Sequence, residues 1–219
     1  MNRTLFVINP NSSPTVTAGI DRALDPLRTA EGPAIACVTL AEGPPGIESQ
    51  RDVDGVAAPL LRRIEALRGE AAGFVVACFS DPGLHAAREA TDRPVLGIME
   101  GGLLTALTLG QRVGIVAILD RSIPRHRRAV GAMGLNDRLA GDRALGLGVG
   151  DLADAPRTLA RMVEVGRALK ERDGADVLVM GCAGMAGYRA ELAAAVGLPV
   201  VEPVQAAAGM ALARVRLGW

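Results

Sequence analysis

Short apolar runs alternate with longer amphipathic stretches along the whole chain. Each run is rich in Val, Ile and Leu and is bounded by Gly, Pro or polar residues, which is typical of strands buried on both faces of a sheet. We expect strands at residues 5–8, 34–40, 73–78, 94–98, 113–118, 144–149, 177–181 and 199–201. Helical periodicity is clear from Val53 to Leu67, and Asp154 followed by Pro156 predicts another helix start. Strands that alternate with helices predict an α/β fold with parallel sheets.

The chain also contains a weak internal repeat. The segment FVVACFSDPGLHAAREATDRPVLGI resembles the later VLVMGCAGMAGYRAELAAAVGLPVVEP, because each has an apolar run, a cysteine, a turn with glycine, an Ala-rich stretch and a Pro-Val pair. The spacing from Cys78 to Cys182 nearly equals the spacing from Pro94 to Pro199. The segments TLFVINPNSSP and RVGIVAILDRSIP would begin the two copies. We therefore predict two similar lobes with a cleft between them, against the alternative of chance likeness between ordinary strand–helix units.

Composition narrows the classes of function. The 219 residues carry 24 basic and 24 acidic side chains, so no basic excess favours nucleic acid as a partner. A small basic cluster around Arg127 and Arg128 is typical of a solvated helix face. The apolar runs are short and interrupted, and we expect a cytoplasmic chain that does not interact with membranes. The sequence has no metal-ligand spacing, no G-x-G-x-x-G after a strand and no P-loop, so we expect no metal and no nucleotide cofactor.

Two of the three cysteines stand at the same place in the repeat. Cys78 and Cys182 each follow a predicted strand and precede a predicted helix. Ligands of open α/β sheets bind at the carboxyl ends of the strands, where backbone N–H groups favour a thiolate and bind an oxyanion. We expect the N–H groups of Phe79, Ser80, Ala183 and Gly184 to supply this stabilisation; the alternative is that they only cap helices.

A pair of thiols facing each other across a cleft has a specific chemical use. Inversion of a carbon acid removes a proton from one face and delivers a proton to the other, which needs one thiolate and one thiol. Either cysteine alone would more often be a buried core residue, but matched placement in two repeats favours a catalytic pair. Cys37 lies inside an apolar run with no turn after it, and we expect it in the core.

Four motifs resemble those of hydantoin racemases and the related allantoin racemases of the aspartate/glutamate/hydantoin racemase superfamily. They are INPNSS (8–13), GIES (46–49), ACFSDPGL (77–84) and MGCAGM (180–185), and together they span nearly the whole chain. The resemblance implies two pseudo-symmetric flavodoxin-like lobes with the active site in the cleft between them. The first lobe would comprise residues 1–98 and the returning C-terminal helix at 204–219, and the second lobe residues 99–203.

The resemblance also implies the chemistry. In such enzymes two cysteines exchange a proton at the stereocentre of the substrate without metal or pyridoxal phosphate, which assigns Cys78 and Cys182 here as the catalytic pair. The expected substrate is a 5-substituted hydantoin or a related cyclic ureide such as allantoin. Enzymes of this group are often homo-oligomers, so we expect this chain to form a homo-oligomer. We expect it to bind a small-molecule substrate.

Differences from neighbouring families favour a hydantoin racemase over other enzymes of the superfamily. Amino-acid racemases of the superfamily usually have His where this chain has Gly184, and Asp-Ser where it has Asn9-Pro10. Arylmalonate decarboxylases lack the first cysteine, whereas Cys78 is present. An amino-acid racemase, a maleate-type isomerase or a decarboxylase remains the alternative enzyme. A non-catalytic protein whose two lobes close on a small ligand is the alternative from another class.

Several polar residues are candidates for contact with such a substrate. Asn9 and Asn11 follow the first strand, and their amides suit the neutral N–H and C=O groups of a cyclic ureide, or else only cap the next helix. Glu48 either contacts the ligand or holds its loop. Asp81 is expected to cap a helix and point away from the thiol. Glu100 and Glu202 follow predicted strands and either line the site or lie at the surface or the hinge. Of the two histidines, His85 is expected to face solvent.

Overall fold

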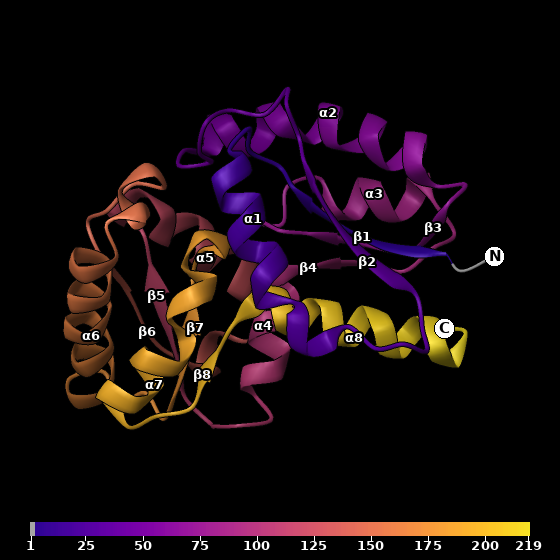
Figure 1. Cartoon of the computed structure of the whole chain (residues 1–219). Helices are drawn as coiled ribbons and strands as arrows, with labels where there is room; N and C mark the ends of the chain where they lie inside the picture. Colours follow the sequence, from indigo (N-terminus) through magenta and orange to yellow (C-terminus); the bar gives the residue numbers. More distant parts are fainter. Residues whose placement is uncertain (1–2) are drawn as a thin grey trace.

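The computed structural model describes residues 3–219, and within them two parallel four-stranded sheets share one strand order. That order is β2-β1-β3-β4 in the first sheet and β6-β5-β7-β8 in the second. The strands are β1 (Thr4–Asn9), β2 (Ala34–Thr39), β3 (Ala71–Val76), β4 (Val95–Gly97), β5 (Val113–Ala117), β6 (Leu139–Ala144), β7 (Val177–Met180) and β8 (Val200–Val201). The repeated order confirms the predicted α/β fold with two similar lobes (Figure 1).

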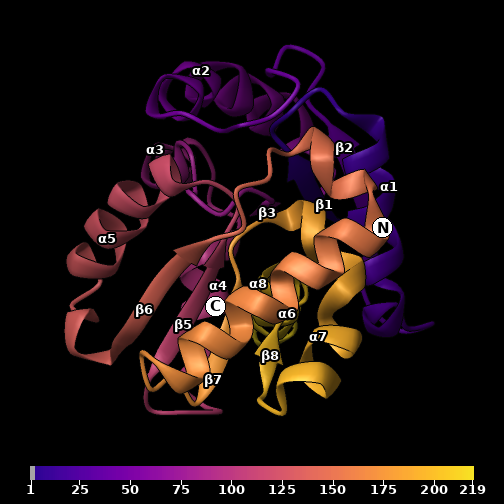
Figure 2. The same cartoon turned by 90° about the vertical axis from the view of Figure 1, so that its left-hand side faces the viewer.

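Helices join the strands in both lobes. They are α1 (Pro14–Ala23), α2 (Gln50–Leu67), α3 (Leu84–Ala90), α4 (Ile98–Ala106), α5 (Ile123–Ala132), α6 (Ala155–Glu171), α7 (Arg189–Val196) and α8 (Pro203–Leu217). Short 3₁₀ turns are η1 (Asp25–Leu27), η2 (Asp120–Ser122), η3 (Asn136–Arg138), η4 (Gly150–Ala153) and η5 (Ala183–Tyr188). Figure 2 faces the second lobe, with α6 and α7 in front of its sheet. The predicted helix start at Asp154 is confirmed, because its carboxylate accepts a hydrogen bond from the N–H of Arg157.

The strands differ in how deeply they are buried. All residues of the inner strands β3, β5 and β7 are buried, whereas the edge strands β2 and β6 are mostly half-buried. The strand predicted at 144–149 is wrong, since β6 ends at Ala144 and begins at Leu139. As an edge strand it carries Asp142 and Arg143 and has no apolar run. The run that suggested a strand is an irregular segment, and its Leu145 and Leu147 are buried in the core.

Two helices pack against the sheet of the other lobe. Helix α4, which follows the last strand of the first sheet, lies against β7 and β8, and α8, which follows the last strand of the second sheet, lies against β3 and β4. The two helices also pack against each other (Figure 1). Gly101 permits this approach, because a Cβ there would lie 2.9 Å from the Cα of Ala207. The exchange of α4 and α8 ties the two lobes together.

One hydrophobic cluster runs through both lobes. It joins Val75 of β3 to Val113 and Val179 of the second sheet by way of α4 and α8. A division of the chain after residues 98 and 203 would assign each helix to the sheet it covers, and it stays a prediction. None of the helices within residues 3–219 has the length and apolarity needed to cross a membrane.

Candidate active site

A pocket lies where the strands of both sheets reach their carboxyl ends. Its walls come from the turns after β3 and β7, from α5 and from the loops before α1, α2 and η4. The lining residues are Asn11, Val16, Ile47, Ala77, Cys78, Phe79, Ser80, Ile118, Ser122, Arg125, His126, Val149, Gly181, Cys182, Ala183 and Gly184. Within residues 3–219 no cluster of His, Cys, Asp or Glu side chains is suited to hold a metal ion.

Cys78 enters this pocket from a turn after β3. The preceding Ala77 extends the sheet by donating its N–H to the carbonyl of Ile8 at 2.9 Å, and the chain then turns so that the N–H of Asp81 reaches the carbonyl of Cys78 at 3.0 Å. Burial, as the largest cause, and the charges of Cys182 and Asp81 together raise the pKa of the Cys78 thiol to about 12, against a lowering contribution from the N–H of Ser80. The thiol is therefore neutral at pH 7.

Cys182 enters the pocket from the equivalent turn after β7. Its thiol sulfur accepts a hydrogen bond from the N–H of Gly184 at 3.4 Å, and Cys182 is thereby the N-cap of η5. Burial raises the pKa of Cys182 to about 11, the N–H of Gly184 lowers it and the charge of Glu48 raises it. The expected preference for thiolate is not found for either cysteine, because loss of solvation outweighs the local N–H groups.

The helix expected directly after Cys78 begins later than predicted. Helix α3 starts at Leu84, and its N-cap is Gly83, which makes no side-chain cap. Asp81 caps a different helix: its buried carboxylate accepts the N–H groups of Met99 at 3.0 Å and Glu100 at 2.9 Å, at the start of α4. Burial raises the pKa of Asp81 to about 7. Asp81 thus fastens the turn that carries Cys78 to α4, as a cap the local sequence could not reveal.

The two asparagines after β1 have different positions. Asn11 lines the pocket, and Asn9 does not. The buried amide of Asn9 donates to the Oδ1 of Asn11 at 2.8 Å and to the Oγ1 of Thr17 at 3.0 Å, and its own Oδ1 accepts the N–H of Asn11 at 3.3 Å. The amide of Asn9 therefore braces Asn11, and the predicted contact of Asn9 with the substrate stays a prediction.

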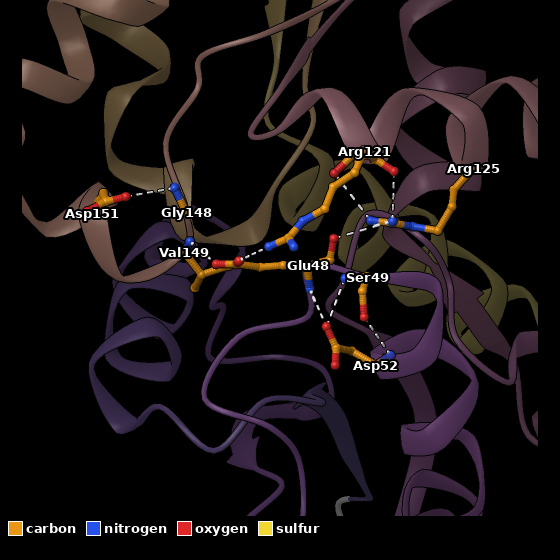
Figure 3. A network of polar contacts seen from close by, with 9 residues as sticks. Glu48, Ser49, Asp52, Arg121, Arg125, Gly148, Val149 and Asp151 are labelled. Atoms are coloured by element: carbon orange, nitrogen blue, oxygen red, sulfur yellow. Dashed lines mark hydrogen bonds and ion pairs between the residues drawn. The ribbon is translucent and has the colours of Figure 1, made fainter.

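Glu48 lies outside the lining and joins the two lobes. Its carboxylate accepts the N–H of Val149 at 2.8 Å and forms an ion pair with Arg121 at 2.5 Å (Figure 3). Glu48 stands just before α2, and both partners belong to the second lobe. Of the two roles considered for Glu48, the structure supports the one in which it holds its loop.

Arg125 and His126 of α5 line the pocket, and sequence reasoning missed both. Both residues are buried, and the Nδ1 of His126 lies 2.9 Å from the Oδ2 of Asp142 on β6. The ring of His126 meets Phe79 edge-on at a centroid distance of 5.2 Å. The internal repeat could have indicated this position. The segment RVGIVAILDRSIP directly precedes Arg125, and it corresponds to the segment TLFVINPNSSP, which contains Asn11. The basic cluster that follows RVGIVAILDRSIP is therefore not all solvated.

The remaining candidates lie away from the pocket. Glu100 forms an ion pair with Arg88 at 2.6 Å, and the buried carboxylate of Glu202 caps α8 through the N–H groups of Val204 and Gln205. His85 is exposed, as predicted. Cys37 is half-buried and packs against the core cluster, in agreement with the expected core position.

Comparison with known proteins gives concordant results across nearly the whole chain. Residues 5–211 match the family model described as Asp/Glu/Hydantoin racemase. The hydantoin racemase of Paenarthrobacter aurescens is 34% identical over 218 residues, covering 98% of this chain and 92% of that protein. Two solved structures are similar. Allantoin racemase from Klebsiella pneumoniae has a TM-score of 0.90 and 33% identity, covering 99% of this chain and 89% of that chain. Allantoin racemase from Pseudomonas fluorescens has a TM-score of 0.93 and 28% identity, covering 98% of this chain and 92% of that chain.

Proposed function

The chain belongs to the Asp/Glu/hydantoin racemase family, and from this premise we propose that it is a cofactor-independent racemase of 5-substituted hydantoins or of a related cyclic ureide such as allantoin. The observation that carries the proposal is that Cys78 and Cys182 line one pocket from equivalent turns of the two lobes. A racemase needs one proton-transferring group on each side of the stereocentre, and the pseudo-symmetry of the sheets supplies this arrangement.

The proposed reaction uses both cysteines in each turnover. The thiolate of one cysteine removes the proton from the ring carbon next to the carbonyl, so that the C–H bond breaks, an S–H bond forms and the electron pair moves to the carbonyl oxygen. The thiol of the other cysteine then returns a proton to the opposite face of that carbon. The two cysteines have exchanged protonation states, and the enzyme is ready for the reverse direction.

The polar groups around the thiols suit a neutral ring with N–H and C=O groups. We propose that backbone N–H groups of Phe79, Ser80, Ala183 and Gly184 bind the carbonyl oxygen as negative charge develops on it. Asn11, whose Oδ1 is held by the protein, would donate from its Nδ2 to a second ring oxygen. The pocket lining, taken over residues 3–219, contains no carboxylate that could pair with the ammonium group of an amino acid, which favours a cyclic ureide as the substrate.

The raised pKa values have a consequence for the proposed reaction. A thiol with a high pKa is a strong base once it is deprotonated, and it matches the weak acidity of a carbon acid. The same shift makes the active form, with one thiolate, scarce at neutral pH. We therefore expect kcat/KM to rise by about tenfold per pH unit between pH 6.5 and 8.5.

Proton exchange at the stereocentre tests the proposal directly. Single enantiomers of several 5-substituted hydantoins and of allantoin would be incubated with the protein in D₂O and followed by NMR and polarimetry. We expect loss of optical rotation with deuterium entering the stereocentre, and the same from the control Cys37→Ser. The double variant of Cys78→Ser and Cys182→Ser should be silent. Absence of exchange with every substrate, from folded protein with free thiols, would contradict the proposed function.

The assembly and location of the chain follow from the same premise. We propose that it forms a homo-oligomer in the cytoplasm, as resemblance to its relatives suggests. Light scattering coupled to size-exclusion chromatography measures the mass in solution, and a mass of one chain would contradict the oligomer.

A further inference from the structure

Arg125 of α5 is a buried guanidinium whose contacts are all neutral. It is 8% exposed. Its polar partners are the Oγ of Ser122 at 3.2 Å, the carbonyl of Arg121 at 3.1 Å, the carbonyl of Glu48 at 3.4 Å and the Oγ of Ser80 at 3.5 Å. Figure 3 shows the contacts with Arg121 and Glu48. Burial of a charge without an opposite charge costs free energy, which a protein recovers when a ligand supplies that charge.

The carboxylates near Arg125 are committed to other groups. Glu48 forms its ion pair with Arg121, and Asp52 accepts the N–H of Glu48 at 3.1 Å while it completes the cap of α2. Burial lowers the pKa of Arg125, and the charges of Cys78 and Asp52 raise it. A guanidinium keeps its proton at neutral pH in such surroundings, so the positive charge stands in the wall of the pocket.

A second depression adjoins the pocket at this residue. It lies between α2 and α5, and its walls include Gln50 and Val53 from α2 and Arg128 from α5. Ser80 and Arg125 line both the pocket and this groove. Because the pocket and the groove share these two residues, a substituent that points towards the groove from a ring bound at the cysteines would meet the guanidinium of Arg125.

We propose, resting on the proposed racemase function, that Arg125 is a specificity-determining residue and that the substrate is a cyclic ureide whose ring substituent carries a carboxylate. The planar guanidinium binds a carboxylate through two parallel hydrogen bonds and gains strength from the buried setting. A site that holds a buried charge also rejects the neutral analogue, because binding it leaves that charge unpaired. The exposed Arg128 adds a second positive charge at the outer end of the groove.

The test compares two substrates that differ in one charge. A hydantoin with a carboxyethyl substituent and its carboxamide isostere would be assayed at pH 7.5 for deuterium exchange at the ring carbon. The readout is the ratio of the two kcat/KM values, which a merely structural role of Arg125 would not move. The variants are Arg125→Leu and Arg125→Lys, and the matched control is Arg127→Leu, at an exposed position of the same helix that lines neither the pocket nor the groove.

We expect the wild-type protein to favour the acid by about tenfold or more, as one charge-assisted pair provides. Arg125→Leu should abolish this preference, Arg125→Lys should restore part of it, and Arg127→Leu should leave it unchanged. If Arg125→Leu slows both substrates by the same factor, the guanidinium serves the ring or the fold, and the proposal is overturned. A wild-type protein that racemises the amide but does not favour the acid also overturns it. Racemisation of neither substrate by folded protein would refute the racemase function itself, and the inference with it.

Discussion

The two lobes share one strand order but hold their cysteines differently. In the first lobe the turn that carries Cys78 is fastened to α4, because Asp81 in that turn caps the helix. In the second lobe the equivalent helix α8 is capped by Glu202, a residue at its own start, and the turn that carries Cys182 makes no such link. The thiol of Cys182 instead accepts an N–H from within its turn. The two lobes thus share the positions of the thiols and not their surroundings.

This difference makes the two thiols unequal. Burial is the largest cause for both thiols and raises the pKa of Cys78 to about 12 and that of Cys182 to about 11. The charge of Asp81 adds to the rise at Cys78 and that of Glu48 to the rise at Cys182, and a backbone N–H group lowers each pKa. We infer that both cysteines are thiols in most molecules of the empty enzyme at neutral pH, and that Cys182 is more often the thiolate in the molecules that carry one. Reaction then begins most often with proton removal by Cys182, from the enantiomer whose proton faces it.

Loss of either thiol should have the largest effect. Cys78→Ser and Cys182→Ser should each lower the rate of racemisation by about 100-fold or more, because a serine hydroxyl is too weak an acid to replace a thiol as the proton-transferring group. Circular dichroism would check that the variants are folded. A single variant that keeps full activity would mean that one cysteine is dispensable, and it would remove the basis of the comparison.

Asp81→Asn should remove the negative charge of Asp81 and keep part of its cap on α4. An asparagine tolerates the left-handed backbone at this position, where φ is +44°, but it can accept fewer N–H groups, so we expect a loss of about 1–2 kcal/mol in the free energy of unfolding. Removal of the negative charge should lower the pKa of Cys78 and leave that of Cys182 unchanged. Alkylation of each thiol as a function of pH, followed by mass spectrometry, measures this. A control is Asp92→Asn at an exposed site, and equal shifts of both thiols would contradict the account.

Glu202→Gln should change the pH dependence of stability. Burial raises the pKa of Glu202 to about 7, above its ordinary value of 4.5. The stability that this carboxyl contributes is therefore fully present below pH 4.5 and is lost as pH rises through 7. The advantage of the wild-type protein over Glu202→Gln in the free energy of unfolding should shrink by about 2–3 kcal/mol between pH 5 and pH 8. Denaturant titrations at both pH values measure it, and a constant difference would show that burial does not govern this group.

Glu48→Gln should have the smallest effect on stability. Its ion pair with Arg121 is partly exposed, so we expect a loss below about 1 kcal/mol. Because the charge of Glu48 raises the pKa of Cys182, the variant should lower that pKa and leave Cys78 unaffected. The alkylation profile again measures the outcome, with the exposed Glu42→Gln in the same loop as the control. An unchanged alkylation profile of Cys182 would show that Glu48 does not raise the pKa of this thiol.

The sequence predicted what local patterns and the repeat encode. Inner strands are continuous apolar runs, and the cysteines follow two of them, so the fold and the meeting of Cys78 with Cys182 in one pocket could be anticipated. The edge strand β6 was misplaced because its residues are mostly half-buried and its sequence LAGDRA has no apolar run that would distinguish it from a loop.

The rest of the site depends on contacts between distant segments. CFSDPG has the pattern of a helix start, but the carboxylate of Asp81 caps α4 instead of α3, and only the tertiary structure determines that choice. Arg125 and His126 stand in a basic run that is typical of a solvated face. Packing of α5 against β6 and against the turn after β3 turns these two side chains inward, and their neighbours Arg127 and Arg128 remain exposed.

The most direct test of two bases on opposite faces is deuterium exchange by each single-cysteine variant with each enantiomer of one hydantoin. Each remaining thiolate can remove a proton only from the face it meets. We predict that Cys78→Ser exchanges the stereocentre proton of one enantiomer, that Cys182→Ser exchanges that of the other, and that neither variant racemises its substrate at the wild-type rate. Exchange of the same enantiomer by both variants would place the two thiols on one face and contradict the two-base account.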